Sequence, residues 1–126
     1  MARLLVVDDS SFMRRHLVRF LTEAGHKVVG QGEDGRQGFD LYKKLRPDFV
    51  IMDVTMRGTD GITGARMIRD YDPGARLVFI SMISDPDVIA EAKRLGAIDF
   101  IGKDAYDRIL AAVSGDFKGR ETNGPA

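Results

Sequence analysis

The sequence predicts an α/β protein with a doubly wound, five-stranded parallel sheet and five helices. The first observation is a set of five short apolar runs, at 3–7, 27–31, 49–52, 76–80 and 98–101. The second is that a segment with helix-capping signals follows each run, and this alternation is typical of parallel strands joined by helical crossovers. The third is size, because a chain of 126 residues is long enough to bury the core of one domain.

The first two helices have clear start and stop signals. Ser10 or Ser11, after the first strand, can cap a helix whose stop is Gly25. Asp34, after the second strand, can cap a helix that ends before Pro47. Both segments therefore fit the crossover positions between strands.

The remaining helices are signalled in the same way. Asp60 can cap a third helix, and Asp85 followed by Pro86 is the clearest start in the chain, because proline fits the first helical turn. That fourth helix stops at Gly96, and a fifth begins near Ala105.

The composition excludes several function classes. Lys and Arg together number 19, as do Asp and Glu, so a generic nucleic-acid or membrane binder is not expected. The absence of Cys rules out disulfides and thiolate metal sites. No apolar run approaches the roughly 20 residues of a membrane span, so we expect a soluble, cytoplasmic protein. Residues 115–126 are polar and rich in Gly, which predicts a domain over 1–114 and a flexible C-terminal tail.

Polar side chains follow four of the five predicted strands. Asp8 and Asp9 follow the first strand, Asp53 the third, Ser81 the fourth and Lys103 the fifth. Each has an ordinary explanation when taken alone, since Asp often caps helices or begins turns. However, ligands bind beyond the carboxyl ends of strands in doubly wound sheets. Three carboxylates gathered there form an oxygen-rich pocket of the kind that Mg²⁺ prefers.

Four motifs extend this pattern: VVDDS at 6–10, IMDVTMRGTDG at 51–61, FIS at 79–81 and GAIDFIGK at 96–103. In order and spacing they resemble the receiver domain of two-component response regulators, most closely the stand-alone chemotaxis type. The resemblance implies a flavodoxin-like sheet in the order 2-1-3-4-5. That order sets the first and third strands side by side.

The resemblance also implies roles for the strand-end residues. Asp53 would be the phosphoacceptor, taking a phosphoryl group from the phosphohistidine of a sensor histidine kinase. Asp8 and Asp9 would hold Mg²⁺, with help from Asp53 and the backbone carbonyl of Thr55, and Lys103 would pair with the phosphoryl oxygens. Such charge neutralisation is what attack by a carboxylate on an anionic group requires. The implied domain catalyses its own phosphorylation and dephosphorylation and is not a turnover enzyme.

Ser81 and Phe100 match the family's switch residues, and Ser81 would also bind the phosphoryl group. We expect the face made by the fourth helix, fifth strand and fifth helix to bind a downstream target such as a motor, kinase or enzyme. Three residues depart from the family pattern: Met82 replaces a small residue, and Arg57 and Asp104 replace proline. A cis bond before a non-proline residue costs about 2.5–4 kcal/mol, so we expect a trans bond before Asp104, whose side chain can then cap the fifth helix.

Other functions fit the sequence less well. A phosphorylation-independent binding module with the same fold is supported only by Met82 and Asp104. An aspartate-based phosphohydrolase expects an acid two residues after its nucleophile, where this chain has Thr55. A flavin-binding role lacks a phosphate loop after the first strand, and a DNA-binding regulator would need an effector domain.

Overall fold

The structure, a computed structural model, describes the backbone of residues 1–122 and the side chains of residues 1–114. Strands and helices alternate along the chain as the sequence predicts. The elements are β1 (Arg3–Val7), α1 (Ser11–Glu23), β2 (Lys27–Gly32), α2 (Gly35–Leu45), β3 (Phe49–Asp53), α3 (Gly61–Tyr71), β4 (Leu77–Ser81), α4 (Pro86–Arg94), β5 (Asp99–Gly102) and α5 (Tyr106–Thr122). Within the described part, no helix is long and apolar enough to cross a membrane.

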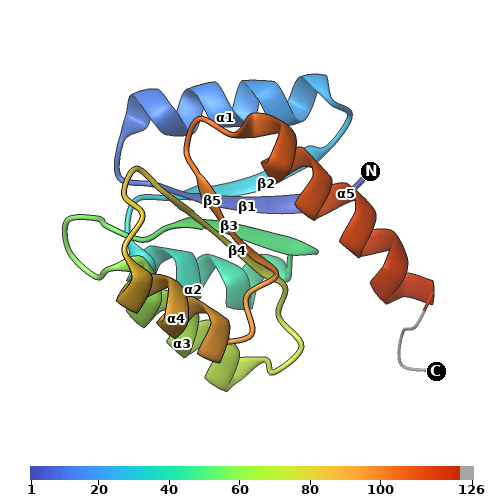
Figure 1. Cartoon of the computed structure of the whole chain (residues 1–126). Helices are drawn as coiled ribbons and strands as arrows, with labels where there is room; N and C mark the ends of the chain where they lie inside the picture. Colours follow the sequence, from blue (N-terminus) through green and yellow to red (C-terminus); the bar gives the residue numbers. More distant parts are fainter. Residues whose placement is uncertain (123–126) are drawn as a thin grey trace.

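The five strands form one parallel sheet in the order β2-β1-β3-β4-β5, which confirms the predicted doubly wound fold. Helices α1 and α5 cover one face, and α2, α3 and α4 cover the other (Figure 1). The chain leaves β1 toward one side of the sheet and β3 toward the other. The crevice at which such sheets bind ligands therefore lies at the carboxyl ends of these two neighbouring strands.

The sheet separates two apolar cores. Strands β1, β3 and β4 are buried on both faces, which explains why their sequences are continuous apolar runs. Side chains alternate along each strand, so Val6 and Ile51 join the core under α1 and α5, whereas Val7 and Met52 join the core over α2, α3 and α4. The same alternation decides on which face each strand-end side chain lies.

Four helices are capped as predicted by the side chain that precedes them. The caps are Ser10, Asp34, Asp60 and Asp85, each of which accepts a hydrogen bond from a backbone N–H of the first turn. Ser10 is thus the cap of α1, because α1 begins at Ser11. Strand β3 extends one residue further than predicted, through Asp53, and β4 is shifted by one residue, so that ladder pairing continues through Ser81.

Helix α5 starts close to the predicted position near Ala105 and extends past residue 114. The helix begins at Tyr106, so Ala105 occupies the capping position, and no hydrogen bond within the described part makes Asp104 the predicted cap. The peptide bond before Asp104 is trans, as predicted. The helix continues to Thr122, past the predicted domain boundary at residue 114, and the rest of the predicted tail, 123–126, lies outside the described residues.

Candidate functional site

Three charged side chains leave the same face of the sheet at its carboxyl edge. Asp8 directly follows β1, Asp53 is the last residue of β3, and Lys103 directly follows β5. Two positions before each of them lies a member of the core under α1 and α5, namely Val6, Ile51 and Ile101. Strand alternation therefore turns all three toward α1 and α5.

The Lys103 ammonium bridges two buried carboxylates. Its Nζ lies 2.8 Å from Oδ2 of Asp8 and 3.1 Å from Oδ2 of Asp53. The side chains are only 7%, 2% and 5% exposed for Lys103, Asp8 and Asp53. A buried charge is tolerated when it is paired and hydrogen-bonded, and here one cation serves two anions. The buried part of the site keeps a net negative charge.

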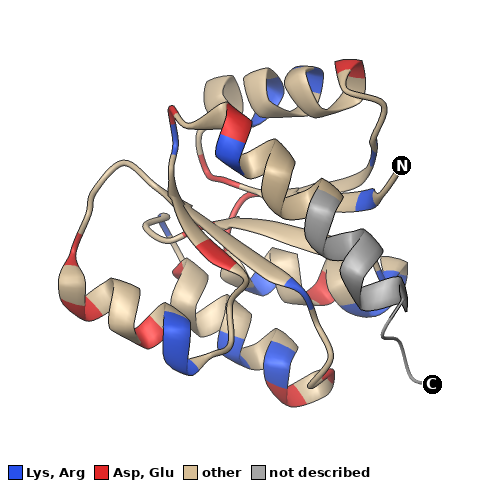
Figure 2. Ribbon diagram, turned by 45° about the vertical axis from the view of Figure 1, so that its right-hand side comes forward, with Lys and Arg blue, Asp and Glu red and all other residues tan. Residues whose placement is uncertain are grey.

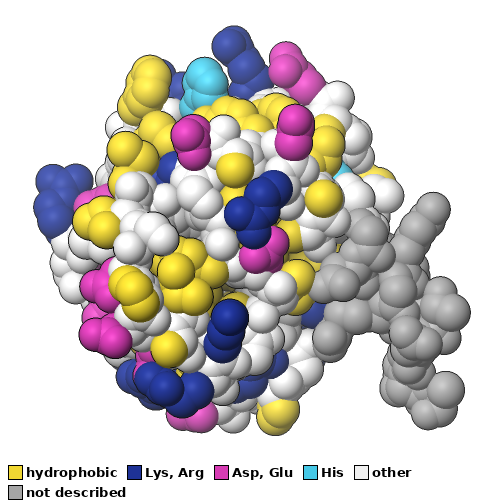
Figure 3. Space-filling model, in the orientation of Figure 1, with side chains coloured by type: hydrophobic (Ala, Val, Ile, Leu, Met, Phe, Trp, Pro, Cys, Tyr) yellow, Lys and Arg dark blue, Asp and Glu magenta, His cyan; other side chains and the backbone are white. Residues whose placement is uncertain are grey.

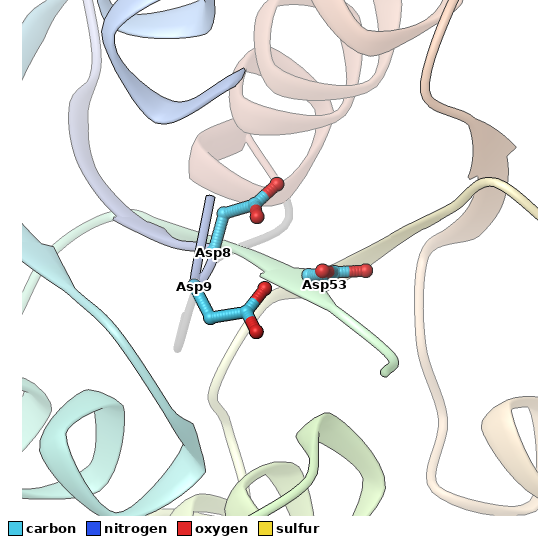
Figure 4. A group of neighbouring side chains, drawn as sticks. All are labelled: Asp8, Asp9 and Asp53. Carbon is cyan, nitrogen blue, oxygen red and sulfur yellow. The ribbon is translucent and has the colours of Figure 1, made fainter. Parts of the chain in front are cut away.

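Asp9 forms an acidic cluster with Asp8 and Asp53 and is its most exposed member. One carboxylate oxygen from each of Asp8, Asp9 and Asp53 lies within 4.8 Å of the other two (Figure 4). Asp9 stands in the loop after β1 and is partly exposed, so an ion can approach from its side. Three converging carboxylates are a donor set that suits Mg²⁺, which retains waters at its remaining positions.

Burial is the main influence on Asp53 and raises the pKa of its carboxyl to about 6. The hydrogen bond from Lys103 opposes this rise, and the neighbouring charge of Asp8 adds to it. Burial also disfavours the charged form of Lys103, but the hydrogen bonds to Asp8 and Asp53 outweigh it and raise the pKa of the ammonium above its usual value. At neutral pH the site therefore presents an ionised Asp53 beside a firmly protonated Lys103.

Ser81 and Phe100 lie on the opposite face of the sheet. Both share that face with Phe79, whose ring centroid is 6.4 Å from that of Phe100. The Ser81 hydroxyl donates a hydrogen bond to the carbonyl of Ile83 at 2.8 Å and accepts one from the N–H of Ile83 at 3.0 Å. In this conformation the hydroxyl is engaged by its own loop.

Three contacts of the site have no clear signal in the sequence. Thr55, expected to offer its carbonyl to a metal, donates its backbone N–H to the Asp53 carboxylate. Arg57 donates both its backbone N–H and its Nε–H to Asp9. Arg14 donates from Nη1 to the carbonyl of Asp8 at 2.5 Å. The sequence marked Arg57 only as a residue that stands where the family has proline.

Comparisons with known proteins agree on one family. The sequence model of the protein family described as the response regulator receiver domain matches residues 4–114. Protein CcdB of Bacillus subtilis is 44% identical over 115 residues, which cover 90% of this chain and 96% of that protein. Chemotaxis protein CheY of Thermotoga maritima is 41% identical over 101 residues, or 80% of this chain and 84% of that protein. A chain in the CheX–CheY–BeF3–Mg²⁺ complex from Borrelia burgdorferi superposes with a TM-score of 0.85 at 30% identity, over 91% of this chain and 88% of that one.

Proposed function

The chain belongs to the response regulator receiver family, and from that premise we propose that Asp53 accepts a phosphoryl group from the phosphohistidine of a sensor histidine kinase. The observation that carries this proposal is the position of Asp53, a buried carboxylate at the sheet edge with the Lys103 ammonium 3.1 Å away. Because the pKa of Asp53 is about 6, its carboxylate is largely ionised, and so nucleophilic, at neutral pH.

In the proposed transfer, an oxygen of Asp53 forms the new bond to phosphorus while the bond from phosphorus to the histidine nitrogen breaks. Asp8, Asp9 and Asp53 would hold Mg²⁺ together with the carbonyl of Thr55, and the bound ion would offset the negative charge of the phosphoryl oxygens. Lys103 can pair with the same oxygens without moving far, since its Nζ already contacts the acceptor carboxylate. Catalysis of this kind is largely positioning and charge neutralisation.

The proposed switch begins at Ser81. For its hydroxyl to donate to the phosphoryl group, the hydrogen bond that it donates to the Ile83 carbonyl must break, because a hydroxyl has one proton, and this loosens the hold on the β4–α4 loop. Phe100 shares the face of the sheet with Ser81 and can repack when that loop moves. A local chemical change at Asp53 is thereby passed to the surface over α4 and β5.

The proposed partner surface is the face of α4, β5 and α5. A pocket of about 310 Å³ opens there between α4 and β5, and Figure 3 includes exposed hydrophobic side chains among charged ones on this face. Helix α4 carries Asp87 in its first turn and Lys93 and Arg94 in its last (Figure 2). The pocket is lined by Ile89, Ala92, Lys93, Ala97, Ile98, Asp99 and Phe100. A downstream protein target could therefore find apolar and charged contacts side by side.

The test combines a small phosphodonor with a phosphoryl mimic. Acetyl phosphate with Mg²⁺ should modify Asp53, as located by borohydride trapping and mass spectrometry, and Asp53→Asn should abolish the modification. Beryllofluoride should shift the amide resonances of Ile83 and Phe100 and of the α4–β5–α5 face. Modification at Asp8 or Asp60 would contradict the role of Asp53. Phosphorylation without any shift on that face would favour the alternative of a phosphorylation-independent binding module.

A further inference from the structure

Arg57 makes an unusual double contact with Asp9. Both its backbone N–H and its Nε–H donate to the same carboxylate oxygen, Oδ2, at 3.1 and 3.2 Å. Desolvation of Asp9 opposes its ionisation, but the two hydrogen bonds and the charge of Arg57 outweigh it and hold the pKa of this carboxyl below its usual value. Asp9 therefore has its own cation, contributed by the β3–α3 loop.

The three carboxylates of the cluster are thus paired with two cationic side chains of the protein itself. Lys103 pairs with Asp8 and Asp53 inside the protein, and Arg57 pairs with Asp9 at the surface. The two cations differ sharply in accessibility, because the Arg57 side chain is 88% exposed whereas that of Lys103 is 7% exposed. Arg57 can leave Asp9 for solvent at little cost, since its guanidinium remains largely hydrated in the pair.

We propose that Arg57 is a tethered cation that competes with Mg²⁺ for the Asp9 carboxylate and so raises the metal concentration at which the site fills. This inference rests on the metal site of the proposed function. The competition is electrostatic, because a bound divalent ion and the guanidinium would lie on either side of one carboxylate, and two positive charges so close together repel. The backbone N–H of Arg57 can keep its bond to Asp9, so only the side chain has to move.

The proposal predicts a graded effect on metal affinity. An exposed ion pair contributes about 0.2–1 kcal/mol, so Arg57→Gln, which removes the charge, should bind Mg²⁺ about 1.4- to five-fold more tightly at low ionic strength. The gain should shrink at high salt, where exposed charges are screened. Arg57→Lys keeps the charge and should stay close to the wild type.

The dissociation constant for Mg²⁺ can be measured by following amide resonances near Asp8 and Asp53 during a titration. Arg66→Gln is the matched control, because Arg66 is an exposed arginine paired with Glu91 on the surface of α3 and α4. Equal affinities of the wild type and Arg57→Gln at low salt, or weaker binding by Arg57→Gln, would overturn the inference while leaving the metal site in place. Absence of Mg²⁺ binding in the wild type and in every variant would instead overturn the metal site itself.

Discussion

Replacing Asp53 with Asn should make the metal-free protein more stable, although it removes the proposed nucleophile. The reason is that the folded state holds this carboxylate in a place that disfavours its charge. Asp53 is buried, and burial and the nearby charge of Asp8 raise its pKa despite the opposing hydrogen bond from Lys103. An amide of nearly the same shape removes the charge and leaves Lys103 paired with Asp8 at 2.8 Å.

The size of the effect follows from the pKa. The folded value is about 6 and the usual value is 3.8, so at about 1.4 kcal/mol per pKa unit the ionised carboxylate costs the folded state roughly 3 kcal/mol above pH 6. An amide is not identical to a protonated acid, so we expect a gain of about 1–3 kcal/mol at neutral pH. The folded wild type binds more protons than the unfolded chain between about pH 4 and 6, so its stability rises as the pH falls through this window. The advantage of Asp53→Asn should therefore fade toward pH 4.

Asp72→Asn is a matched variant that should change the stability in the opposite direction. Asp72 accepts a hydrogen bond from the Tyr42 hydroxyl at 2.5 Å, and this bond, against the effect of burial, holds the pKa of Asp72 below its usual value. Its ionised form is favoured by folding, so the same chemical change should destabilise the protein at neutral pH. The two substitutions separate the effect of local environment from any general effect of removing an acid.

The assay is urea unfolding of the metal-free protein in the presence of EDTA. Because the chain contains no Trp, unfolding is monitored by far-UV circular dichroism. Adding Mg²⁺ should then stabilise the wild type more than Asp53→Asn, since a ligand of the folded state adds stability. A destabilised Asp53→Asn at neutral pH, or a gain that persists unchanged near pH 4, would refute the reasoning.

Two further predictions concern packing and pH. Gly61→Ala should lower the free energy of unfolding by at least about 2 kcal/mol and weaken phosphorylation of Asp53, because an added Cβ would lie 1.9 Å from the Asp53 carbonyl oxygen. Gly74→Ala is the control, since its Cβ would lie 3.4 Å from Oδ1 of Asp72. Equal stabilities of the two variants would contradict the idea that close packing requires glycine at position 61. Burial lowers the pKa of His26, whose Nδ1 accepts a hydrogen bond from the Ala2 N–H at 3.0 Å. Relative to His26→Asn, the wild type should therefore lose stability as the pH falls below about 6.5 in thermal unfolding, and parallel pH profiles of the two proteins would contradict this expectation.

The sequence predicted best what depends on neighbours along the chain. Caps such as Asp34 and Asp60 act on N–H groups three residues away, and apolar runs mark the strands wherever they pair. The strand-end acids could be predicted to meet because carboxyl ends of parallel strands share one edge. The bond from Arg57 to Asp9 could not, because it joins loops 48 residues apart in the sequence, and nothing local indicates where an exposed arginine will lie.

The two loops beside Asp53 are held very differently, and under the proposed function this difference would separate metal entry from signalling. The β3–α3 loop is fixed at several points: the Gly35 N–H bonds to the Thr59 carbonyl at 2.7 Å, and the Gly61 N–H bonds to the Val54 carbonyl at 2.9 Å. Metal binding at Asp9 should therefore move the Arg57 side chain and leave this backbone in place. The β4–α4 loop, 82–85, is exposed along its length, and the bonds that hold Ile83 go to Ser81 itself. Under the proposed function, drawing the Ser81 hydroxyl toward Asp53 would break the bond that it donates to Ile83, so the site would fill beside the loop that is held and signal through the loop that is exposed.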